Sequence, residues 1–259
     1  MPLHAVVLGG GLLSSGDPLY DSAPGGHRSL IPIGHKPMAQ LVINALCGSP
    51  AVQSITVIGL TPESGLQATK PLDFLPDSGS MFENIKVGVL HAAEILPAQD
   101  KVIIASSDIP AIQPDMVDWL ANQIAKTPET LIYYNVIQKE TMEQRFPLAG
   151  RSYVRFKDIS VCGGDLNVID RRLFMAEKPI WKELTENRKH PLRQAALLGL
   201  DNLLLVALHL VTLDNAVKRI CRRLEMEATA LLCPFAEMAM DADKPHQLEI
   251  LRQHLEGQQ

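Results

Sequence analysis

The stretch HAVVLGGG at residues 4–11 decides the fold. Its first part, from His4 to Leu8, is a short apolar run that predicts a buried strand. Three glycines follow at once, and glycines directly after a first strand indicate a backbone that closely approaches a ligand, commonly phosphate. The stretch therefore predicts an α/β sheet that begins with a strand and a phosphate-binding loop.

Outward from this stretch, strand and helix patterns alternate along the chain. Further strands are predicted over residues 55–60, 101–105, 131–137, 152–156, 162–169 and 228–233. Amphipathic helices are predicted over residues 37–48, 82–96, 114–124 and around Leu248, Leu251 and Leu255. This alternation predicts a three-layer α/β/α fold with a mostly parallel mixed sheet, in a single domain over residues 1–259. We expect a helical elaboration at about 171–226, where Thr212 is placed to cap a helix.

The composition of the chain indicates which partners it can bind and in which compartment it is expected. The net charge of −5 argues against a general nucleic-acid binder, which would carry a basic surface. The four cysteines form no C-x-x-C pair, so we interpret them as small buried side chains in a reducing compartment rather than a zinc site. The apolar run of residues 4–8 is too short for a signal peptide and no basic region precedes it, which predicts a cytoplasmic protein.

One long apolar stretch, residues 195–213, needs a membrane check. It contains Asp201, Asn202 and His209, and an Asp near a bilayer centre costs about 2.5–3.5 kcal/mol. We therefore expect no membrane span, but one or two buried helices broken near residues 199–201. The alternative is a contact surface for a second copy of the chain in a homodimer.

Two glycine signatures compete for the first loop. The dinucleotide fingerprint G-x-G-x-x-G would need a third glycine where Ser14 stands and an acidic residue at the end of the second strand, which instead ends in Gly59-Leu60. Prolines and glycines also keep residues 17–26 open, so no helix follows the loop at once. A long open loop followed by a cation and a Gly-x-Lys-Pro turn fits better.

The segments GGG at 9–11, RSLIPI at 28–33 and GHKPM at 34–38 carry that second pattern. They resemble the nucleotidyltransferase family that includes molybdenum-cofactor guanylyltransferases and sugar-phosphate nucleotidyltransferases, whose fold is that of nucleotide-diphospho-sugar transferases. The resemblance implies that Arg28 takes the place of the family's phosphate-contacting Lys. The family's loop Arg-x-Gly is absent, because SSGD stands at residues 14–17. The nucleotide contacts implied are Leu8, Gly9, Gly10, Gly11, Arg28, Ser107 and, at the base, Gly79.

Two aspartates lie where a metal for such a reaction would bind. Asp108 follows the apolar run KVIIA at 101–105, and the carboxyl ends of strands are where ligands bind in open α/β sheets. Asp243 lies in MDADKP at 240–245. Each alone is equally compatible with an Asx turn or a helix start. Together they resemble the family's D-x-P and D-x-D-x-P-x-x-L motifs, which implies that Asp108 and Asp243 bind Mg²⁺ or Mn²⁺, with Asp241 able to substitute for Asp243.

Cations near the middle of the chain suggest an acceptor site. Arg151, Tyr153, Arg155 and Lys157 alternate as one strand face would, which suits either an anionic acceptor or plain solvent exposure. GGDLN at 163–167 resembles the family's Gly-Gly-x-x-Asn element, which implies that Gly164 and Asn167 contact the acceptor. An Asn in a turn also needs no function. We interpret His27 and His35 as solvent-exposed loop residues.

The hypothesis from the sequence is a metal-dependent nucleotidyltransferase with Arg28, Asp108 and Asp243 as catalytic residues. It would transfer a nucleoside monophosphate from a nucleoside triphosphate to a phosphorylated small molecule and release pyrophosphate. One alternative is a glycosyltransferase of similar fold, which would normally show D-x-D where this chain has SSD at 106–108. Another is a catalytically degenerate nucleotide-binding protein, which the absent loop Arg favours and the two aspartates oppose.

Overall fold

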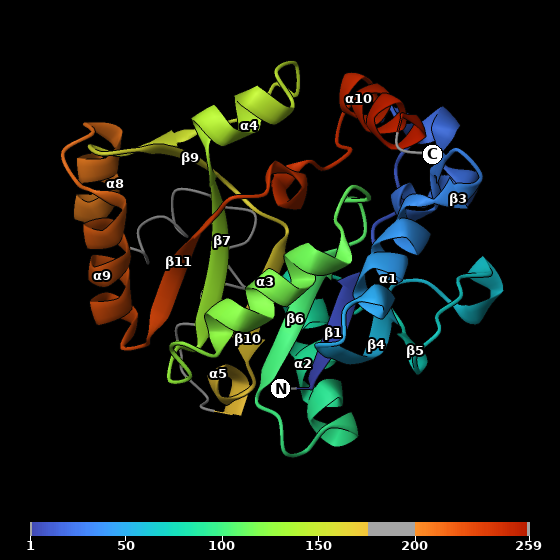
Figure 1. Ribbon diagram of the computed structural model, residues 1–259, viewed down its shortest axis with the longest axis horizontal. Helices are drawn as coiled ribbons and strands as arrows, with labels where there is room; N and C mark the ends of the chain where they lie inside the picture. Colours follow the sequence, from blue (N-terminus) through green and yellow to red (C-terminus); the bar gives the residue numbers. More distant parts are fainter. Residues whose placement is uncertain (1, 176–199, 258–259) are drawn as a thin grey trace.

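One nine-stranded sheet organises residues 2–175 and 200–257, the part of the chain that the computed structural model describes. The strand order is β5-β4-β1-β6-β10-β7-β9-β8, and β11 pairs with β7 (Figure 1). The strands are β1 (Leu3–Leu8), β4 (Val52–Ile58), β5 (Leu72–Leu75), β6 (Lys101–Ser106), β7 (Ile132–Gln138), β8 (Val154–Arg155), β9 (Ser160–Gly163), β10 (Leu166–Asp170) and β11 (Ala228–Cys233). A separate small hairpin joins β2 (Pro32–Ile33) to β3 (Lys36–Pro37).

The sheet is mixed, with its parallel part around β1. Strand β1 runs parallel to β4 and β6, and β4 runs parallel to β5. Strand β10 is antiparallel to both β6 and β7. The carboxyl ends of β1 and β6 therefore meet at one edge of the sheet, which is where ligands bind in open α/β folds.

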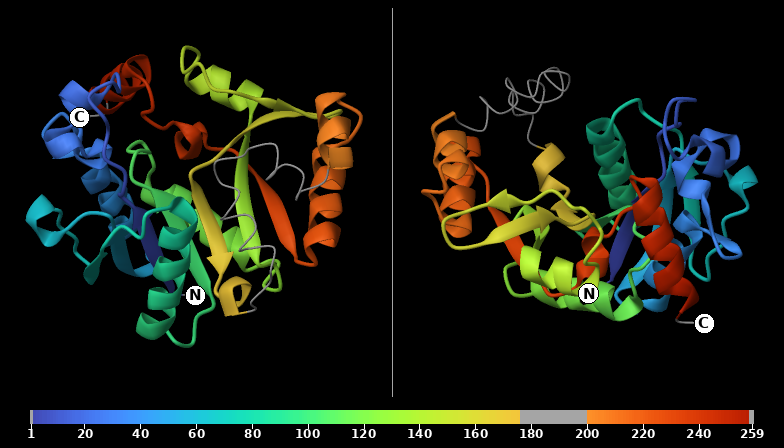
Figure 2. Two further views of the ribbon diagram at one scale, coloured as in Figure 1. Left: turned by 180° about the vertical axis from the view of Figure 1, so that it is seen from behind. Right: turned by 90° about the horizontal axis from the view of Figure 1, so that it is seen from above.

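Helices cover both faces of the sheet. Helices α1 (Met38–Gly48) and α3 (Pro114–Ile124) lie on one face, and α2 (Met81–Ile95) lies on the other (Figures 1 and 2). Alternation along β1 explains the two cores: Leu3, Ala5 and Val7 join the larger cluster, while Val6 packs with Val89 of α2. The predicted three-layer α/β/α class and its mostly parallel mixed sheet are confirmed.

Four of the remaining described helices lie around the sheet's second half, and the last one in the chain lies beside the β2–β3 hairpin (Figure 1). They are α4 (Lys139–Arg145), α5 (Arg172–Met175), α8 (Leu200–Ala207), α9 (Leu213–Leu224) and α10 (Pro245–Glu256). Thr212 caps α9 as predicted, since its Oγ1 accepts a hydrogen bond of 3.3 Å from the Asn215 backbone N–H. The described parts of the elaboration predicted at 171–226 include α5, α8 and α9, and residues 176–199 lie outside the described residues.

The apolar stretch at residues 195–213 is not buried as predicted. Residues 195–199 lie outside the described part, but Leu204, Leu208 and Leu210 are exposed, and Val211 is buried. Helix α8 stands at the far edge of the sheet, where its contacts are with β8 and α9 (Figure 1). Leu204 in this helix and Leu208 just after it therefore remain exposed. Within the described residues, no helix is both long and apolar enough to cross a membrane.

Other differences from the sequence predictions are local. The strand expected over 152–156 shrinks to β8, and two short elements, β5 and α4, were not predicted. The four cysteines are free thiols, with Cys162 and Cys233 buried and Cys47 and Cys221 half-buried.

Candidate functional site

The glycine loop leaves the carboxyl end of β1 between its two parallel neighbours. The Gly9 N–H donates to Ile58 O at 2.8 Å, and the Ser107 N–H donates to Leu8 O at 3.3 Å. Gly59, after β4, has φ of 87°, and a Cβ there would lie 2.3 Å from the Gly10 Cα. The tight approach of these two backbones therefore requires glycine at position 59.

A buried serine, Ser29, holds the glycine loop in place by hydrogen bonds. The sequence analysis did not identify this residue. The Ser29 hydroxyl donates to Gly9 O at 2.8 Å and lies 2.7 Å from the Ser107 hydroxyl. Both serines are buried. These two hydrogen bonds join the ends of β1 and β6 to the segment that carries Arg28. The guanidinium of Arg28 is therefore placed beside the glycine loop.

Arg28 lies among three carboxylates from distant parts of the chain. Its Nη1 contacts Asp243 Oδ1 and lies 3.7 Å from Asp108 Oδ2, while Nη2 lies 3.9 Å from Asp17 Oδ2. The side chain of Asp108 is 14% exposed, that of Arg28 27% and that of Asp243 49%. The structure thus brings together the three predicted catalytic residues, and adds Asp17 from the segment that replaces the family's loop Arg.

Burial dominates the electrostatics of Asp108. Removal from water raises the pKa of Asp108, and the nearby Asp243 adds to the increase. A hydrogen bond of 2.5 Å from the Ser106 hydroxyl and the charge of Arg28 oppose it. An enclosed carboxylate of this kind gains from any additional cation at the site.

Gly79, which the sequence analysis predicts at the base, lies in a turn close to the glycine loop. Asp77 accepts hydrogen bonds of 2.9 Å from both the Gly79 N–H and the Asn84 side chain, which lower the pKa of Asp77. A Cβ at Gly10 would lie 3.3 Å from the Asp77 carboxylate. The turn before α2 therefore faces the loop after β1.

The cations predicted for the acceptor do not share one strand face. Arg151 precedes β8 and its side chain, 14% exposed, contacts Asp241 and lies 3.8 Å from Asp165 Oδ2. Lys157 follows β8, is exposed, and donates its backbone N–H to Val211 O at 2.9 Å. The strand is only two residues long because the Phe156 N–H bonds to Ile159 O and turns the chain.

Gly164 lies in the turn between β9 and β10, and Asn167 is the second residue of β10. The Asn167 amide accepts from the Asn135 backbone N–H and donates to Gly164 O, each at 2.8 Å. These bonds hold the turn, and the acceptor role of both residues stays a prediction. Asp165 lies between these two residues in the sequence. Its burial and the nearby charge of Asp108 raise its pKa to about 7.

The two histidines differ from each other. His35 is exposed as predicted, but His27 is half-buried, and its Nδ1 makes no hydrogen bond with any described residue. The backbone of His27 pairs across the loop with Leu12 in an isolated antiparallel bridge.

A family model for the MobA-like NTP transferase domain matches residues 5–224. The chain belongs to the MobA-like NTP transferase family. This transferase is therefore a nucleotidyltransferase, as predicted. The match covers the glycine loop, Arg28 and Asp108, and it ends before Asp241 and Asp243.

Solved structures extend the comparison over nearly the whole chain. A hypothetical transferase from Thermus thermophilus is 31% identical with a TM-score of 0.82, covering 96% of this transferase and 100% of the other chain. A CMP:2-keto-3-deoxy-manno-octonic acid synthetase complexed with CTP is 14% identical, with a TM-score of 0.56 and coverage of 100% and 99%. The 4-diphosphocytidyl-2C-methyl-D-erythritol synthase from Anaerococcus prevotii DSM 20548 is 8% identical, with a TM-score of 0.57 and coverage of 98% and 96%. The latter two support the fold alone, and no curated protein matches the transferase.

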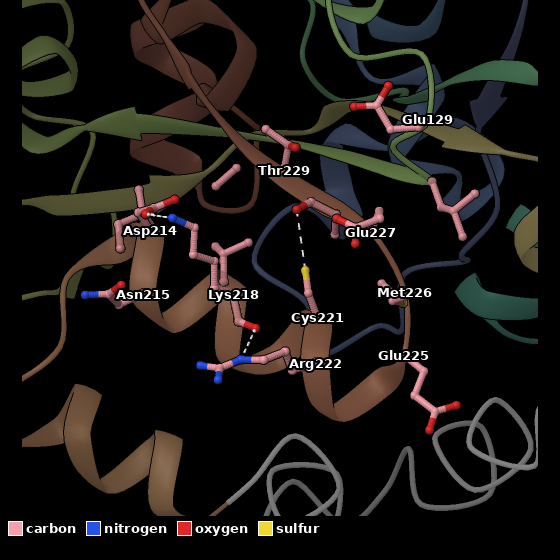
Figure 3. A pocket seen from close by; sticks show the side chains of 15 residues that line it. Glu129, Asp214, Asn215, Lys218, Cys221, Arg222, Glu225, Met226, Glu227 and Thr229 are labelled. Atoms are coloured by element: carbon pink, nitrogen blue, oxygen red, sulfur yellow. Dashed lines mark hydrogen bonds and ion pairs between the residues drawn. The ribbon is translucent and has the colours of Figure 1, made fainter.

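A separate cavity of about 820 Å³ lies between α9 and β11 of the transferase (Figure 3). Asp214 and Lys218 at its rim form an ion pair of 2.7 Å, and the Cys221 thiol donates to Ala228 O at 3.5 Å. None of the residues that line this cavity is among the predicted site residues.

Proposed function

We propose that the transferase moves a nucleoside monophosphate from a nucleoside triphosphate to a phosphorylated small molecule with the help of a divalent cation. The supporting observation is the meeting of Arg28, Asp108 and Asp243 beside the glycine loop, at the carboxyl ends of β1 and β6. These residues are up to 215 positions apart in the chain. If these residues formed ion pairs only to stabilise the fold, they would not need to meet beside a glycine loop.

The donor would lie along the loop after β1. Backbone N–H groups of Gly10 and Gly11 are suited to the phosphates, and Gly9, whose own N–H donates to Ile58 O, would line them. Arg28 adds a guanidinium that can bind phosphate oxygens bidentately. We place Leu8 and Ser107 against the nucleotide and Gly79 at the base. The closeness of Gly10 and the Asp77 turn supports the last assignment.

The donor set suits Mg²⁺ or Mn²⁺. Asp108 and Asp243 approach the same Arg28 nitrogen, and with Asp17 they outnumber its positive charge three to one. Within residues 2–175 and 200–257, no group of three or more His, Cys, Asp or Glu side chains is arranged for a metal. Two carboxylates plus phosphate oxygens and waters are what Mg²⁺ commonly uses. When bound there, the cation would neutralise charge on the triphosphate and on the departing pyrophosphate.

Reaction by in-line displacement needs no covalent intermediate on the protein. An acceptor phosphate oxygen forms a bond to the α-phosphorus while the bond from that phosphorus to pyrophosphate breaks. We place the acceptor near Gly164, Asn167, Lys157 and Arg151. The residues then act by positioning and charge stabilisation.

A thermal-shift screen tests the donor site. ATP, GTP, CTP and UTP are compared with UDP-glucose and GDP-mannose, each with Mg²⁺ or with EDTA, on wild type and Asp108→Asn. We expect one triphosphate to stabilise the wild type by about 2.7 kcal/mol at a hundredfold excess over Kd, only with metal. The variant should lose this gain, whereas Asp115→Asn, an exposed aspartate in the first turn of α3, should keep it.

Other outcomes separate the alternatives. A shift with a sugar nucleotide but with no triphosphate would favour the glycosyltransferase. A shift that needs no metal and survives in Asp108→Asn would favour nucleotide binding without catalysis. Exchange of labelled pyrophosphate into the bound triphosphate, with candidate nucleotidyl products supplied, then tests the transfer itself.

The homodimer, the alternative interpretation of residues 195–213, has one structural feature in its favour. Leu204, Leu208 and Leu210 are exposed at the α8 end of the sheet, and Val154 of the neighbouring β8 is exposed as well. Light scattering on wild type and Leu204→Glu/Leu208→Glu tests this, because two charges in the patch should convert a dimer to a monomer. A monomeric wild type would contradict the expectation.

A further inference from the structure

The position of the Asp243 carboxylate depends on how its backbone is held. Its side chain is half exposed, so packing does not hold it in place. Its backbone N–H donates to the Gln247 side chain, with 3.1 Å between Asp243 N and Gln247 Oε1. This bond fixes the backbone at the point from which the carboxylate extends.

Gln247 itself is almost completely enclosed. It is 2% exposed, in the first turn of α10, and its Nε2 donates to Ala149 O at 3.1 Å. Ala149 lies 98 positions earlier in the chain. One buried amide therefore connects the Asp243 backbone to the loop that follows α4.

These contacts close a ring. From Ala149 the chain runs through Gly150 to Arg151, whose guanidinium contacts Asp241. From Asp241 the chain returns to Asp243 and Gln247. The Ala242 N–H, inside the ring, donates to Asp108 O at 3.1 Å. The ring thus ties the backbones of both proposed metal ligands to the same support.

We propose that Gln247 is a positioning residue that fixes Asp243 opposite Asp108 for binding of the metal-bound triphosphate. This inference rests on the proposed function. Gln247 would not contact the metal itself. It would hydrogen-bond to the residue that binds the metal and so orient that ligand. A glutamine that only capped α10 would not need the second bond to Ala149 O, in another part of the chain.

The test is the gain in nucleotide affinity that Mg²⁺ provides. For the triphosphate with the largest shift in the screen, calorimetry gives the ratio of Kd in EDTA to Kd in Mg²⁺. We expect Gln247→Met to reduce this ratio about tenfold, the lower range for residues behind metal ligands, while Kd in EDTA stays near wild type. Gln253→Met, on the exposed face of the same helix, should leave the ratio unchanged.

Gln247→Asn covers the case in which the methionine variant does not fold. It keeps the amide but is too short to reach Asp243 N and Ala149 O together, so it should lower the ratio in the same direction. An unchanged ratio in the folded variant, even with a lower melting temperature, would show a purely structural role and overturn the proposal.

Asp243→Asn separates this result from failure of the proposed function. If Asp243→Asn collapses the ratio and the Gln247 variants do not, only the positioning proposal fails. If Asp243→Asn leaves the ratio at the wild-type value, Asp243 binds no metal, and both the metal assignment and the positioning proposal fail.

Discussion

Two arginines of this transferase lie between aspartates, and their surroundings differ. Arg28 contacts Asp243 and has Asp108 and Asp17 within 4 Å, in a cluster that opens to solvent at Asp243. Arg151 contacts Asp241, whose side chain is only 12% exposed, and has Asp165 at 3.8 Å. The first cluster lies beside the glycine loop, and the second lies behind it, against the β9–β10 turn.

The difference in exposure separates two uses of the same pair of residue types. A partly exposed arginine can exchange a carboxylate for a phosphate at small cost, because water screens the carboxylate it leaves. An enclosed arginine cannot leave its partners without stranding buried charge. We therefore expect Arg28 to act mainly on the nucleotide and Arg151 mainly on stability, with acceptor binding by Arg151 still a prediction.

Replacing Arg151 by Met should have the largest effect. Asp241, which is enclosed, would lose its cation, so the free energy of unfolding should fall by about 3–5 kcal/mol. Urea denaturation measures the loss. Arg155→Met, at an exposed arginine in β8, should change stability by no more than about 0.5 kcal/mol. Similar losses in the two variants would contradict the comparison.

Replacing Arg28 by Ala should act on the ligand. Loss of a charged contact to phosphate should weaken binding of the metal-bound triphosphate about 100-fold, equivalent to roughly 2.7 kcal/mol. Stability should change by less than about 1 kcal/mol, because the closest carboxylate, Asp243, is half exposed and Asp108 keeps its hydrogen bond from Ser106. Calorimetry and urea denaturation give the two numbers, and Arg28→Lys should recover part of the affinity. A large loss of stability with unchanged affinity would reverse the roles of the two arginines.

Asp165→Asn tests whether the protein is more stable when Asp165, beside Arg151, carries no charge. The comparison is made at two pH values. Because the pKa of Asp165 rises from 3.8 to about 7 on folding, the wild type incurs a cost of deprotonation that grows as pH increases from about 4 to 7. The asparagine variant avoids it, so it should gain about 1 kcal/mol over wild type at pH 8, a value discounted for partial exposure, and less at pH 5. Urea denaturation at both pH values measures this, with Asp115→Asn as the control. A variant less stable at pH 8 than at pH 5, relative to wild type, would mean that Arg151 needs the Asp165 charge.

Asp17→Asn should have the smallest effect. Asp17 lies 3.9 Å from Arg28 in a partly exposed pair, which is worth about 0–1 kcal/mol. Without it, Arg28 should be freer for phosphate, so the triphosphate should bind up to about threefold more tightly. Weaker binding would show that Asp17 orients Arg28 for the ligand.

Much of the fold was predictable because its elements carry local patterns. Buried runs such as residues 101–105 and the apolar face of α3 agree with the structure within a few residues. Strand β5 lacked such a signal because it has four residues between Pro71 and Pro76. Helix α4 is polar, with only Met142 buried, so it has no apolar face to detect.

The candidate site was predictable where motifs repeat a known order. Arg28, Asp108 and Asp243 each follow from such a motif, and the structure brings them together. Ser29, Asp17 and Gln247 carry no local signature. Ser29 contacts Ser107, 78 positions away, and Gln247 contacts Ala149, 98 positions away. Asp17 lies near Arg28 only through the course of an irregular loop. Arg151 had a signature, but its alternation with Lys157 predicted a strand face that the turn at Phe156 interrupts.

The sequence by itself determined the order of strands and helices, the glycine loop and the residue types available for phosphate and metal. Those properties depend on neighbours a few positions apart, through periodicity and backbone freedom. Only the tertiary structure decided which arginine opens to solvent, which carboxylate is enclosed and which glutamine holds Asp243. Burial and charge pairing at these positions arise from contacts between segments far apart in the chain, and no local pattern specifies them.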